Sequence, residues 1–348
     1  MFAAFIISFI TVVVSLPLII KLFYHFNWIE NPLEKQKKSG NATATSPVPR
    51  GAGISIFFGI FISCFIFLPV DKHLLGIFFA ALFTLLIGVW DDIADISPIL
   101  RLFTNITSAL IVVASGIGIA YISNPFGGVI DLSFLQYSFN LFGSPHSIWI
   151  ISDLLAIIWI TWCLNIVGWS SGVDGQLPGF VSISAFFISL LALKFSADIT
   201  QWPVVILGMA VSGAYLGFLP YNFYPQKIMP GYSGKSLAGF FLAVLSILSG
   251  AKLATLFFLI GIPMLDAIVV IIGRISNKKS PFSPSATHLH HLLLARGWGR
   301  RRIAIFYWLL TLIMGIVSLY LNSQQKFYFF LGLAFVFFAI TLKYFKRI

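Results

Sequence analysis

The sequence predicts an all-α integral membrane protein, a polytopic bundle of about eleven transmembrane helices that forms one membrane-embedded domain over residues 1–348. Hydrophobic residues make up 59% of the chain, charged residues make up 9%, and the mean hydropathy is +0.97. Soluble domains are about a quarter charged, so a soluble globular fold is excluded. The sequence has no series of alternating barrel strands of about ten residues, which leaves a bundle of helices.

Apolar runs between polar segments define the expected spans, since a membrane helix needs about 20 mainly apolar residues. We expect spans near 1–23, 52–70, 73–90, 102–122, 148–167, 178–194, 203–220, 237–249, 253–273, 303–321 and 327–343. The first run lacks a basic segment and a small-residue cleavage site. It is therefore expected to be a retained helix rather than a signal peptide.

Lysine and arginine positions predict the orientation of the bundle. Eighteen of these 22 residues fall in connections on one side, and only Lys72, Lys194, Lys252 and Lys326 fall on the other. Because basic residues are enriched on the cytoplasmic side, the N-terminus is expected outside and the C-terminus in the cytoplasm. The net charge of +11 follows from these flanking residues, so we expect membrane lipids as partners and no nucleic acid.

Three carboxylates follow the span that ends near residue 90: Asp91, Asp92 and Asp95. In a continuing helix, Asp91 and Asp95 would share a face. Adjacent carboxylates repel each other near a membrane unless a cation neutralises them, and their hard oxygen atoms suit Mg²⁺ or Mn²⁺. The alternative is a solvated helix end that pairs with Arg101.

A second polar segment lies at the inner end of the span 148–167. It reads Asn165-Ile-Val-Gly168-Trp-Ser-Ser171-Gly172-Val-Asp174-Gly175. Glycines beside an aspartate allow an irregular backbone that can present the carboxylate of Asp174 to a phosphate or a metal. An ordinary glycine-rich turn is the alternative.

A third segment, Met229-Pro230-Gly231-Tyr232-Ser233-Gly234-Lys235-Ser236, precedes a predicted span. Backbone amides at a helix N-terminus, together with Lys235, predict an anion site; a simple turn and helix start is the alternative. The Gly-Lys-Ser ending is not a nucleotide-binding P-loop, because Met229 occupies the required first glycine position and no strand precedes it.

The longest inner connection, Arg274 to Arg302, contains His288-Leu-His290-His291 and a group of arginines. Histidine and arginine side chains can donate to phosphate oxygens, which predicts an anion-binding role. Zinc binding by the histidines and lipid-headgroup contacts by the arginines are alternatives. Upstream, Asp266 lies near the inner end of an apolar span, and a carboxylate in a membrane span is a functional candidate.

In this order, the motifs resemble those of the polyprenyl-phosphate N-acetylhexosamine-1-phosphate transferases, glycosyltransferase family 4, over Pro47 to Gly297. Pro47-Val-Pro49-Arg50-Gly51-Ala-Gly53 is similar to the family's Pro-Thr-Pro-Arg-x-Gly-Gly loop. The segment from Asp91 to Asp95 is similar to its Asp-Asp-x-x-Asp motif. Pro263 with Asp266, Ser280-Pro281-Phe282 and the histidine motif are similar to its late cytoplasmic loop.

The resemblance implies transfer of a UDP-activated N-acetylhexosamine 1-phosphate to undecaprenyl phosphate, with release of UMP, for cell-wall or surface-polysaccharide synthesis. The site is expected on the cytoplasmic face of the bacterial inner membrane. The histidine motif resembles that of members that use UDP-N-acetylglucosamine. The resemblance implies Mg²⁺ (or Mn²⁺) at the catalytic residues Asp91, Asp92 and Asp174, and substrate binding by Asn165, Asp266, His288, His290, His291, Lys235 and Arg50.

The chain departs from the family pattern at several positions. Gly168 and Ser171 replace an Asn and an Asp, Ser285 and Ala286 replace an acidic-basic pair, and Met229-Pro230-Gly231 replaces Met-Gly-Asp. A catalytically impaired homologue is therefore an alternative, and a lipid or solute transporter is another. The sequence neither requires nor excludes a homodimer.

Overall fold

The structure, a computed structural model, describes residues 1–33, 46–141, 144–194, 201–249, 253–278 and 287–345. The Ser280-Pro281-Phe282 motif and positions Ser285 and Ala286 lie outside these residues. The described helices are α1 (Phe2–His25), α3 (Ala52–Phe67), α4 (Lys72–Ala94), α5 (Pro98–Ala114), α6 (Ile150–Trp169), α7 (Gln176–Leu193), α8 (Gln201–Asn222), α9 (Gly231–Leu248), α10 (Leu253–Leu259), α11 (Gly261–Ser276), α12 (Leu289–Ala295), α13 (Arg300–Tyr320) and α14 (Ser323–Phe345).

Short antiparallel strand pairs complete the described part of the chain. They are β1 (Ile29–Glu30) with β2 (Val48–Pro49), β3 (Tyr121–Ser123) with β4 (Val129–Asp131), and β5 (Gln136–Leu141) with β6 (Ser144–Trp149). The sequence predicted only a long connection between residues 123 and 147. Tyr, Phe, Ile and Val, which favour β-strands, are frequent in that segment.

The predicted class, an all-α integral membrane protein, is confirmed by the helices. Among the described residues, seven helices are long and apolar enough to cross a membrane, or eight if the bent pair α10–α11 forms one more span. The helices α3 and α5 are apolar but shorter. A helix covers most of each predicted span, but the span 102–122 was predicted too long: α5 ends at Ala114, Gly116 follows with a φ of +94°, and β3 begins at Tyr121. The count of eleven spans and the orientation of the bundle stay predictions.

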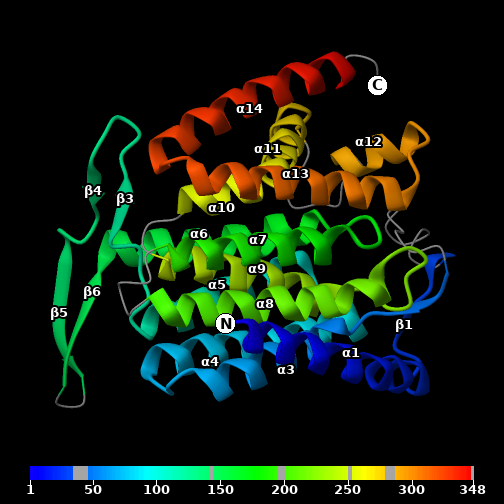
Figure 1. Cartoon of the computed structure of the whole chain (residues 1–348), viewed down its shortest axis with the longest axis horizontal. Helices are drawn as coiled ribbons and strands as arrows, with labels where there is room; N and C mark the ends of the chain where they lie inside the picture. The colour runs from blue at the N-terminus through cyan, green and yellow to red at the C-terminus, as the bar shows by residue number, and fades with distance from the viewer. Residues whose placement is uncertain (34–45, 142–143, 195–200, 250–252, 279–286, 346–348) are drawn as a thin grey trace.

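The predicted span 253–273 is not one straight helix, because α10 and α11 meet at an angle of 79°. The break has a local cause. Pro263 lacks an N–H group, and in a continuous helix its ring would clash with the carbonyl group of Leu259, the last residue of α10. The bend makes α11 run across the direction of the bundle helices and towards α14 (Figure 1), and α11 carries Asp266.

The centre of the bundle is formed by α7, α8 and α9. In α9, 83% of an apolar 18-residue segment is buried, compared with 22% of the corresponding segment in α1, which lies at the periphery. Close packing between apolar helices depends on small residues. A Cβ atom at Gly213 of α8 would lie 2.2 Å from the carbonyl oxygen of Phe5 in α1. Even a methyl group at this position would therefore push the two helices apart.

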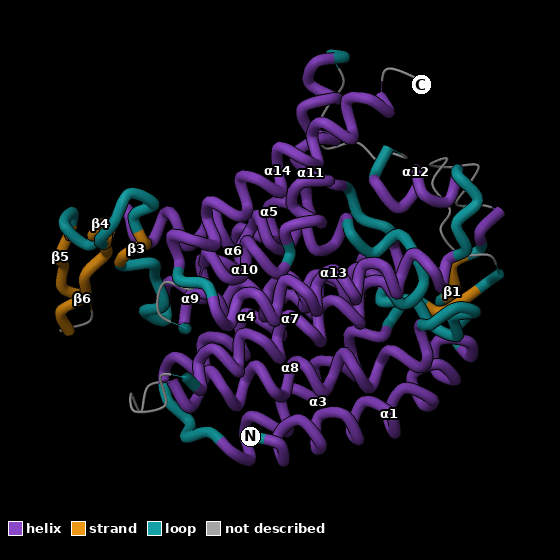
Figure 2. The backbone as a smooth tube through the Cα atoms, turned by 45° about the horizontal axis from the view of Figure 1, so that its top comes forward, coloured by secondary structure: helices purple, strands orange, loops and turns teal. Residues whose placement is uncertain are grey.

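The two ends of the bundle carry different structures. Figures 1 and 2 place the hairpins β3–β4 and β5–β6 at one end and the β1–β2 pair at the other. The β1–β2 end also receives the C-terminus of α4 and the N-termini of α3, α7, α9 and α13, since the chain alternates in direction. The polar segments that the sequence singled out therefore meet at one end, far apart in the chain but close in space.

Candidate active site

The last turn of α4 carries the first group of carboxylates. The helix stops at Asp95, whose φ of 54° lies in the left-handed region. Asp91 is fully buried and Asp92 is 5% exposed. Arg101 binds Asp91 and Asp95 together, with Nε 2.6 Å from Asp91 Oδ1 and Nη2 3.1 Å from Asp95 Oδ1. The predicted shared face is therefore present, and so is the pairing with Arg101 that was its alternative.

Arg50, directly after β2, compensates the charge of this group. Its guanidinium nitrogens lie 3.5 Å from Glu30, 3.7 Å from Asp91 and Asp92, and 3.8 Å from Asp95. Burial acts to lower the pKa of Arg50, but these carboxylates raise it above its ordinary value. The guanidinium therefore stays charged and offsets the repulsion between the adjacent aspartates.

The carboxylate of Asp92 accepts hydrogen bonds from the N-terminus of α9. Its Oδ1 accepts a hydrogen bond from the backbone N–H of Tyr232, and its Oδ2 accepts from the N–H and the hydroxyl of Ser233 at 3.2 and 2.6 Å. The approach needs Gly231, which has a φ of +63° and where a Cβ atom would lie 2.3 Å from Asp92 Oδ2. The sequence predicted an anion at this helix N-terminus, and the structure places the chain's own Asp92 there.

Lys235 lies beside this group, and Asn165 lies one turn before Gly168 on the neighbouring helix α6. The charges of Arg50, Arg101, Asp91 and Asp92 all act on Lys235. The aliphatic part of Lys235 passes Gly168, where a Cβ atom would stand 3.8 Å from it, an ordinary van der Waals distance. Asn165 donates from its side-chain nitrogen to the Thr161 carbonyl of its own helix at 2.7 Å. Lys235 therefore belongs to the charged group, whereas Asn165 uses its amide nitrogen within α6.

Asp174 is presented by the turn between α6 and α7. Gly175 provides the turn with a φ of +79°, and its N–H donates to Asn222 Oδ1 at 2.9 Å. Arg300 at the start of α13 donates from Nη1 to Asp174 Oδ1 at 3.0 Å. Burial raises the pKa of Asp174, and the charge and hydrogen bond of Arg300 oppose that rise. Asp174 Oδ2 is buried and accepts no hydrogen bond of normal geometry.

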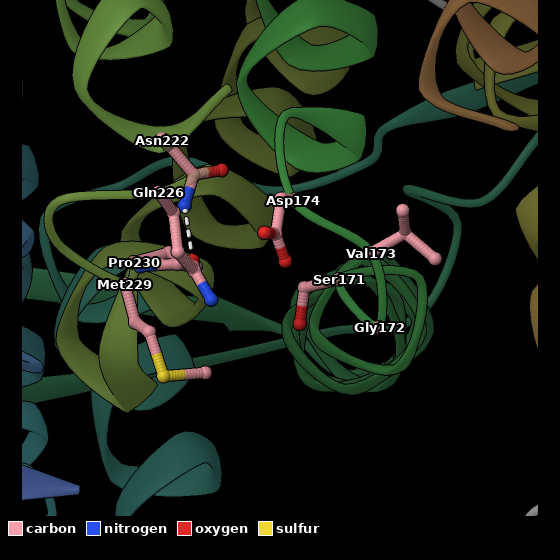
Figure 3. Close-up of a pocket in the computed structure, with 8 residues that line it drawn as sticks. All are labelled: Ser171, Gly172, Val173, Asp174, Asn222, Gln226, Met229 and Pro230. Atoms are coloured by element: carbon pink, nitrogen blue, oxygen red, sulfur yellow. Dashed lines mark hydrogen bonds between the residues drawn. The ribbon is translucent and has the colours of Figure 1, made fainter. Parts of the chain in front are cut away.

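A small pocket lies in front of Asp174. Figure 3 shows its carboxylate between the side chains of Asn222 and Gln226 on one side and Ser171 on the other. Met229 and Pro230, which lead into the start of α9, line the pocket beside Gln226. The pocket therefore lies between the Asp174 turn and the loop whose continuation binds Asp92.

Asp266 on α11 positions the histidine motif. Its Oδ2 lies 2.8 Å from His288 Nδ1, and its Oδ1 accepts the Leu289 N–H at 2.7 Å. The first turn of α12 is thus held by a carboxylate, which favours a helix N-terminus. The ring of His288 stacks on that of His290 with centroids 5.6 Å apart. The ring centroids of His290 and His291 are 4.3 Å apart.

The histidine motif contacts the Asp174 turn directly. A Cβ atom at Gly172 would come within 1.9 Å of His290 Nε2, so only glycine allows this approach. His290 is almost completely buried, and burial, with smaller contributions from His291 and His288, lowers its pKa well below the ordinary value. Burial likewise lowers the pKa of His291. Both rings are neutral near pH 7 and can each donate one N–H.

Comparison with known proteins assigns the chain to a family. The model of glycosyl transferase family 4 matches residues 74–250, which include Asp91, Asp92, Asp174 and the start of α9. The chain belongs to glycosyl transferase family 4. The family resemblance in the motifs is confirmed, and with it the prediction of a transferase.

Several relatives in glycosyl transferase family 4 align over most of the chain. A probable undecaprenyl-phosphate N-acetylglucosaminyl 1-phosphate transferase of Bacillus subtilis is 26% identical, covering 92% of this chain and 84% of the relative. A decaprenyl-phosphate N-acetylglucosaminephosphotransferase of Mycobacterium leprae is 26% identical, with coverage of 78% and 72%. A phospho-N-acetylmuramoyl-pentapeptide-transferase of Bacillus pumilus is 28% identical, with coverage of 84% and 87%.

A divalent cation, which family 4 implies, can be tested against the oxygen atoms of the site. Within the described ranges, no three His, Cys, Asp or Glu side chains come close enough to hold an ion by themselves. Asp91 Oδ2 and Asp174 Oδ2, however, are buried acceptors without a hydrogen bond. Mg²⁺ often takes only one or two carboxylates and completes its shell with waters and substrate phosphates. Each of these oxygen atoms is the kind of ligand that such an ion takes, and that of Asp91 also lies 3.7 Å from Arg50 Nη2.

Some residues of the site were not singled out from the sequence. Arg300 was grouped with arginines expected to bind a phosphate or, as the alternative, lipid headgroups, yet it binds Asp174. Ser233 and Tyr232 lie within a segment that the sequence singled out, but no local pattern indicates that their amides bind Asp92. Asn222, at the end of α8, precedes a polar turn but belongs to no motif that marks it as the partner of Gly175.

Proposed function

We propose that this member of glycosyl transferase family 4 transfers an N-acetylhexosamine 1-phosphate, favoured to be N-acetylglucosamine 1-phosphate, from a UDP-sugar to undecaprenyl phosphate. UMP is released and a lipid-linked diphosphate sugar is formed for cell-wall or surface-polysaccharide synthesis. The relatives in Bacillus subtilis and Mycobacterium leprae, whose names specify a polyprenyl phosphate and N-acetylglucosamine, support this choice. The site is proposed to face the cytoplasm, as the distribution of lysine and arginine predicts.

The observation that carries the proposal is the contact between His290 and Gly172. It joins the histidine motif, oriented by Asp266, to the turn that presents Asp174. Met229 and Pro230 join the same turn to the loop whose continuation binds Asp92. Groups that suit a phosphate or its counter-ion therefore converge at one end of an apolar bundle, where a lipid phosphate and a water-soluble nucleotide can meet.

The reaction requires one P–O bond to form and another to break. An oxygen atom of the lipid phosphate attacks the sugar-linked phosphorus, and the bond between that phosphorus and the oxygen bridging to UMP breaks. UMP leaves with the electron pair of that bond. A phosphate monoester with a second pKa near 6 is already mostly dianionic near pH 7, so a strong general base is not required. The main barrier is the repulsion between two anionic reactants, which charge compensation lowers.

Asp91, Asp92 and Asp174 form the proposed metal and phosphate centre. When bound, Mg²⁺ or Mn²⁺ neutralises charge on the transferring phosphoryl group. Asp91 and Asp174 offer the free oxygen atoms, whereas Asp92 accepts hydrogen bonds on both oxygens and holds the α9 N-terminus in place. Asp92 contributes to this centre chiefly by positioning.

The remaining predicted residues are proposed to bind the nucleotide and the diphosphate. The neutral rings of His290 and His291 can donate to phosphate oxygens, and Asp266 fixes the orientation of His288. Lys235 and Arg50 add positive charge beside the aspartates, and Asn165 lies on the adjoining turn of α6. Apolar spans around this end are proposed to hold the prenyl chain.

The direct test is an assay of the purified full-length protein with Mg²⁺, undecaprenyl phosphate and a panel of UDP-sugars. The lipid product is identified by its mass, and UMP is quantified in the same reaction. We expect UDP-N-acetylglucosamine to give equal amounts of UMP and of the lipid-linked diphosphate sugar. The absence of a lipid product with every UDP-sugar would contradict the proposal, and the Asp174→Asn variant serves as the inactive control.

A further inference from the structure

The β5–β6 hairpin, at the end of the bundle opposite the site, has two chemically different faces. Tyr137 pairs with Ile148 and Ser138 pairs with Ser147 across the strands. Because successive residues of a strand point to opposite faces and paired residues share a face, Tyr137, Phe139 and Ile148 lie on one face and Ser138 and Ser147 on the other. Trp149, which pairs with Gln136, lies on this second face where β6 meets α6. The rings of Tyr137 and Phe139 stack with their centroids 6.2 Å apart. The hairpin therefore has an apolar face and a polar face.

Tyr137 and Ile148 on the apolar face are exposed in the part of the chain that the structure describes. Tyr137 is 62% exposed and Ile148 is 43% exposed. Apart from its pairing with β5, strand β6 packs against α6 at the point where it joins this helix. A lone two-stranded hairpin is only marginally stable in water, so a face of this kind needs an apolar neighbour.

The depth of the hairpin is set by its connection to α6. Strand β6 ends at Trp149, and α6, which is long and apolar enough to cross a membrane, begins at Ile150 without a linker. The Ile150 N–H also donates to the Leu135 carbonyl at 3.0 Å, which anchors the other strand at the same level. Figure 1 shows β5 and β6 running across the ends of the helices. The strands therefore follow the plane of the membrane surface at the depth where α6 leaves it.

The composition of this segment indicates what lies beside it. From residue 121 to residue 149 there is no lysine or arginine, and Asp131 is the one acidic residue. Tyrosine and tryptophan concentrate at membrane–water interfaces, where an aromatic ring with a polar edge is favoured. A segment without basic residues has no electrostatic attraction to anionic headgroups. Its contact with lipid must come from burial of the apolar side chains.

We propose that the β5–β6 hairpin lies flat on the lipid surface, with Tyr137, Phe139 and Ile148 inserted between the headgroups and Ser138 facing water. The occupant of the apolar face is the lipid–water boundary itself. The hairpin fixes the depth and tilt of α6, the helix that carries the Asp174 turn at its other end. This inference does not depend on the transferase activity.

The test uses single-cysteine labels on the two faces in the full-length protein, reconstituted at one copy per phosphatidylcholine nanodisc. Tyr137→Cys and Ile148→Cys probe the apolar face, and their neighbours Ser138→Cys and Ser147→Cys, which form the next pair along the strands, are the matched controls on the polar face. The native Cys64 and Cys163 are completely buried, so the parent chain supplies the labelling background. Each variant carries an environment-sensitive fluorophore. It is exposed to iodide in the water or to lipids with a nitroxide near the headgroup.

We expect lipid nitroxides to quench the labels at 137 and 148 several-fold more strongly than those at 138 and 147, and iodide to show the reverse order. Replacing part of the phosphatidylcholine by an anionic lipid should leave this order unchanged. Equal quenching on the two faces would overturn the proposal. Protection of residue 137 only in discs that hold two copies would also overturn it, because a second copy would then cover the face.

Discussion

The carboxylate of Asp92 accepts hydrogen bonds from both the backbone N–H and the hydroxyl of Ser233, which lies 141 residues later in the chain. The contact joins the end of α4 to the start of α9. It uses a carboxylate that the sequence had assigned to metal binding. The site is therefore held together by one of its own candidate ligands.

Replacing Ser233 by alanine should lower the free energy of unfolding by about 1.5 kcal/mol, since the lost hydrogen bond is to a charged acceptor. Denaturant unfolding of the purified protein in detergent measures the change. Ser184→Ala is the control, because the Ser184 hydroxyl is buried on α7 without a hydrogen-bond partner. Equal stability of the two variants would show that the bond to Asp92 contributes nothing.

Gly231→Ala should destabilise the protein by about 1–3 kcal/mol, because a side chain would occupy a left-handed backbone position. It should also reduce turnover, since the new Cβ atom would collide with the Asp92 carboxylate. Gly273→Ala on α11 is the matched control, with no neighbouring atom within 4 Å of its Cβ position. If Gly231→Ala behaves like this control, the close approach of Asp92 is wrong.

Arg300→Gln should change how stability depends on pH. Burial already raises the pKa of Asp174 in the folded chain, and loss of the Arg300 charge should raise it further. An acid whose pKa is raised by folding binds more protons in the folded state. Stability then falls as pH increases from the ordinary aspartate pKa through the raised value. The variant should extend this fall to higher pH.

Thermal unfolding across a pH series in metal-free buffer measures this shift. Arg301→Gln is the control, because it removes the same charge from the next residue, which donates to the Tyr224 carbonyl. The shift should be absent from the control. An identical pH dependence for both variants would mean that Arg300 does not act on Asp174.

Asp266→Asn should reduce kcat by about 100-fold, since misplacement of a binding group by about 1 Å has effects of that size. The asparagine can no longer hold His288 and the Leu289 N–H in the same way. Steady-state kinetics with UDP-N-acetylglucosamine measure the loss. Asp131→Asn, in the distant β4 strand, should leave kcat at the parent value; parent-level turnover in Asp266→Asn would contradict this role.

Asp174→Asn and Asp92→Asn should both abolish UMP release but differ in metal binding. Asp174 has an oxygen atom free for a cation, whereas both oxygens of Asp92 already accept hydrogen bonds. Mn²⁺ titration followed by electron paramagnetic resonance should therefore show loss of binding for Asp174→Asn and retained binding for Asp92→Asn. The opposite pattern would make Asp92 the ligand and Asp174 a positioning residue.

Local patterns predicted much of the site. The apolar run before Asp91 placed the carboxylates at a helix end, and their spacing placed Asp91 and Asp95 on one face. The family resemblance assigned Asp266 and the histidine motif to the same loop and to substrate binding, and the structure brings the two into contact. Predictions of this kind succeed because they depend on helix periodicity or on a shared motif order.

Contacts between distant segments were not predictable in the same way. The pairing of Arg300 with Asp174 joins residues 126 positions apart. The bend at Pro263 was missed because the apolar run continues through it, so hydropathy alone indicated one straight span. The hairpins between residues 121 and 149 were not predicted, because the apolar runs were used to define helical spans alone.

The sequence by itself determined the membrane class, the positions of the helices and the types of residue available for chemistry. These properties depend on the transfer of side chains between water and lipid and on local backbone geometry, which each segment carries within itself. The tertiary structure decided that Asp92 binds the start of α9, that Arg300 faces Asp174 and that His290 contacts Gly172. Hydrogen bonds and close contacts act over a few ångströms, so their partners are determined only when the helices pack.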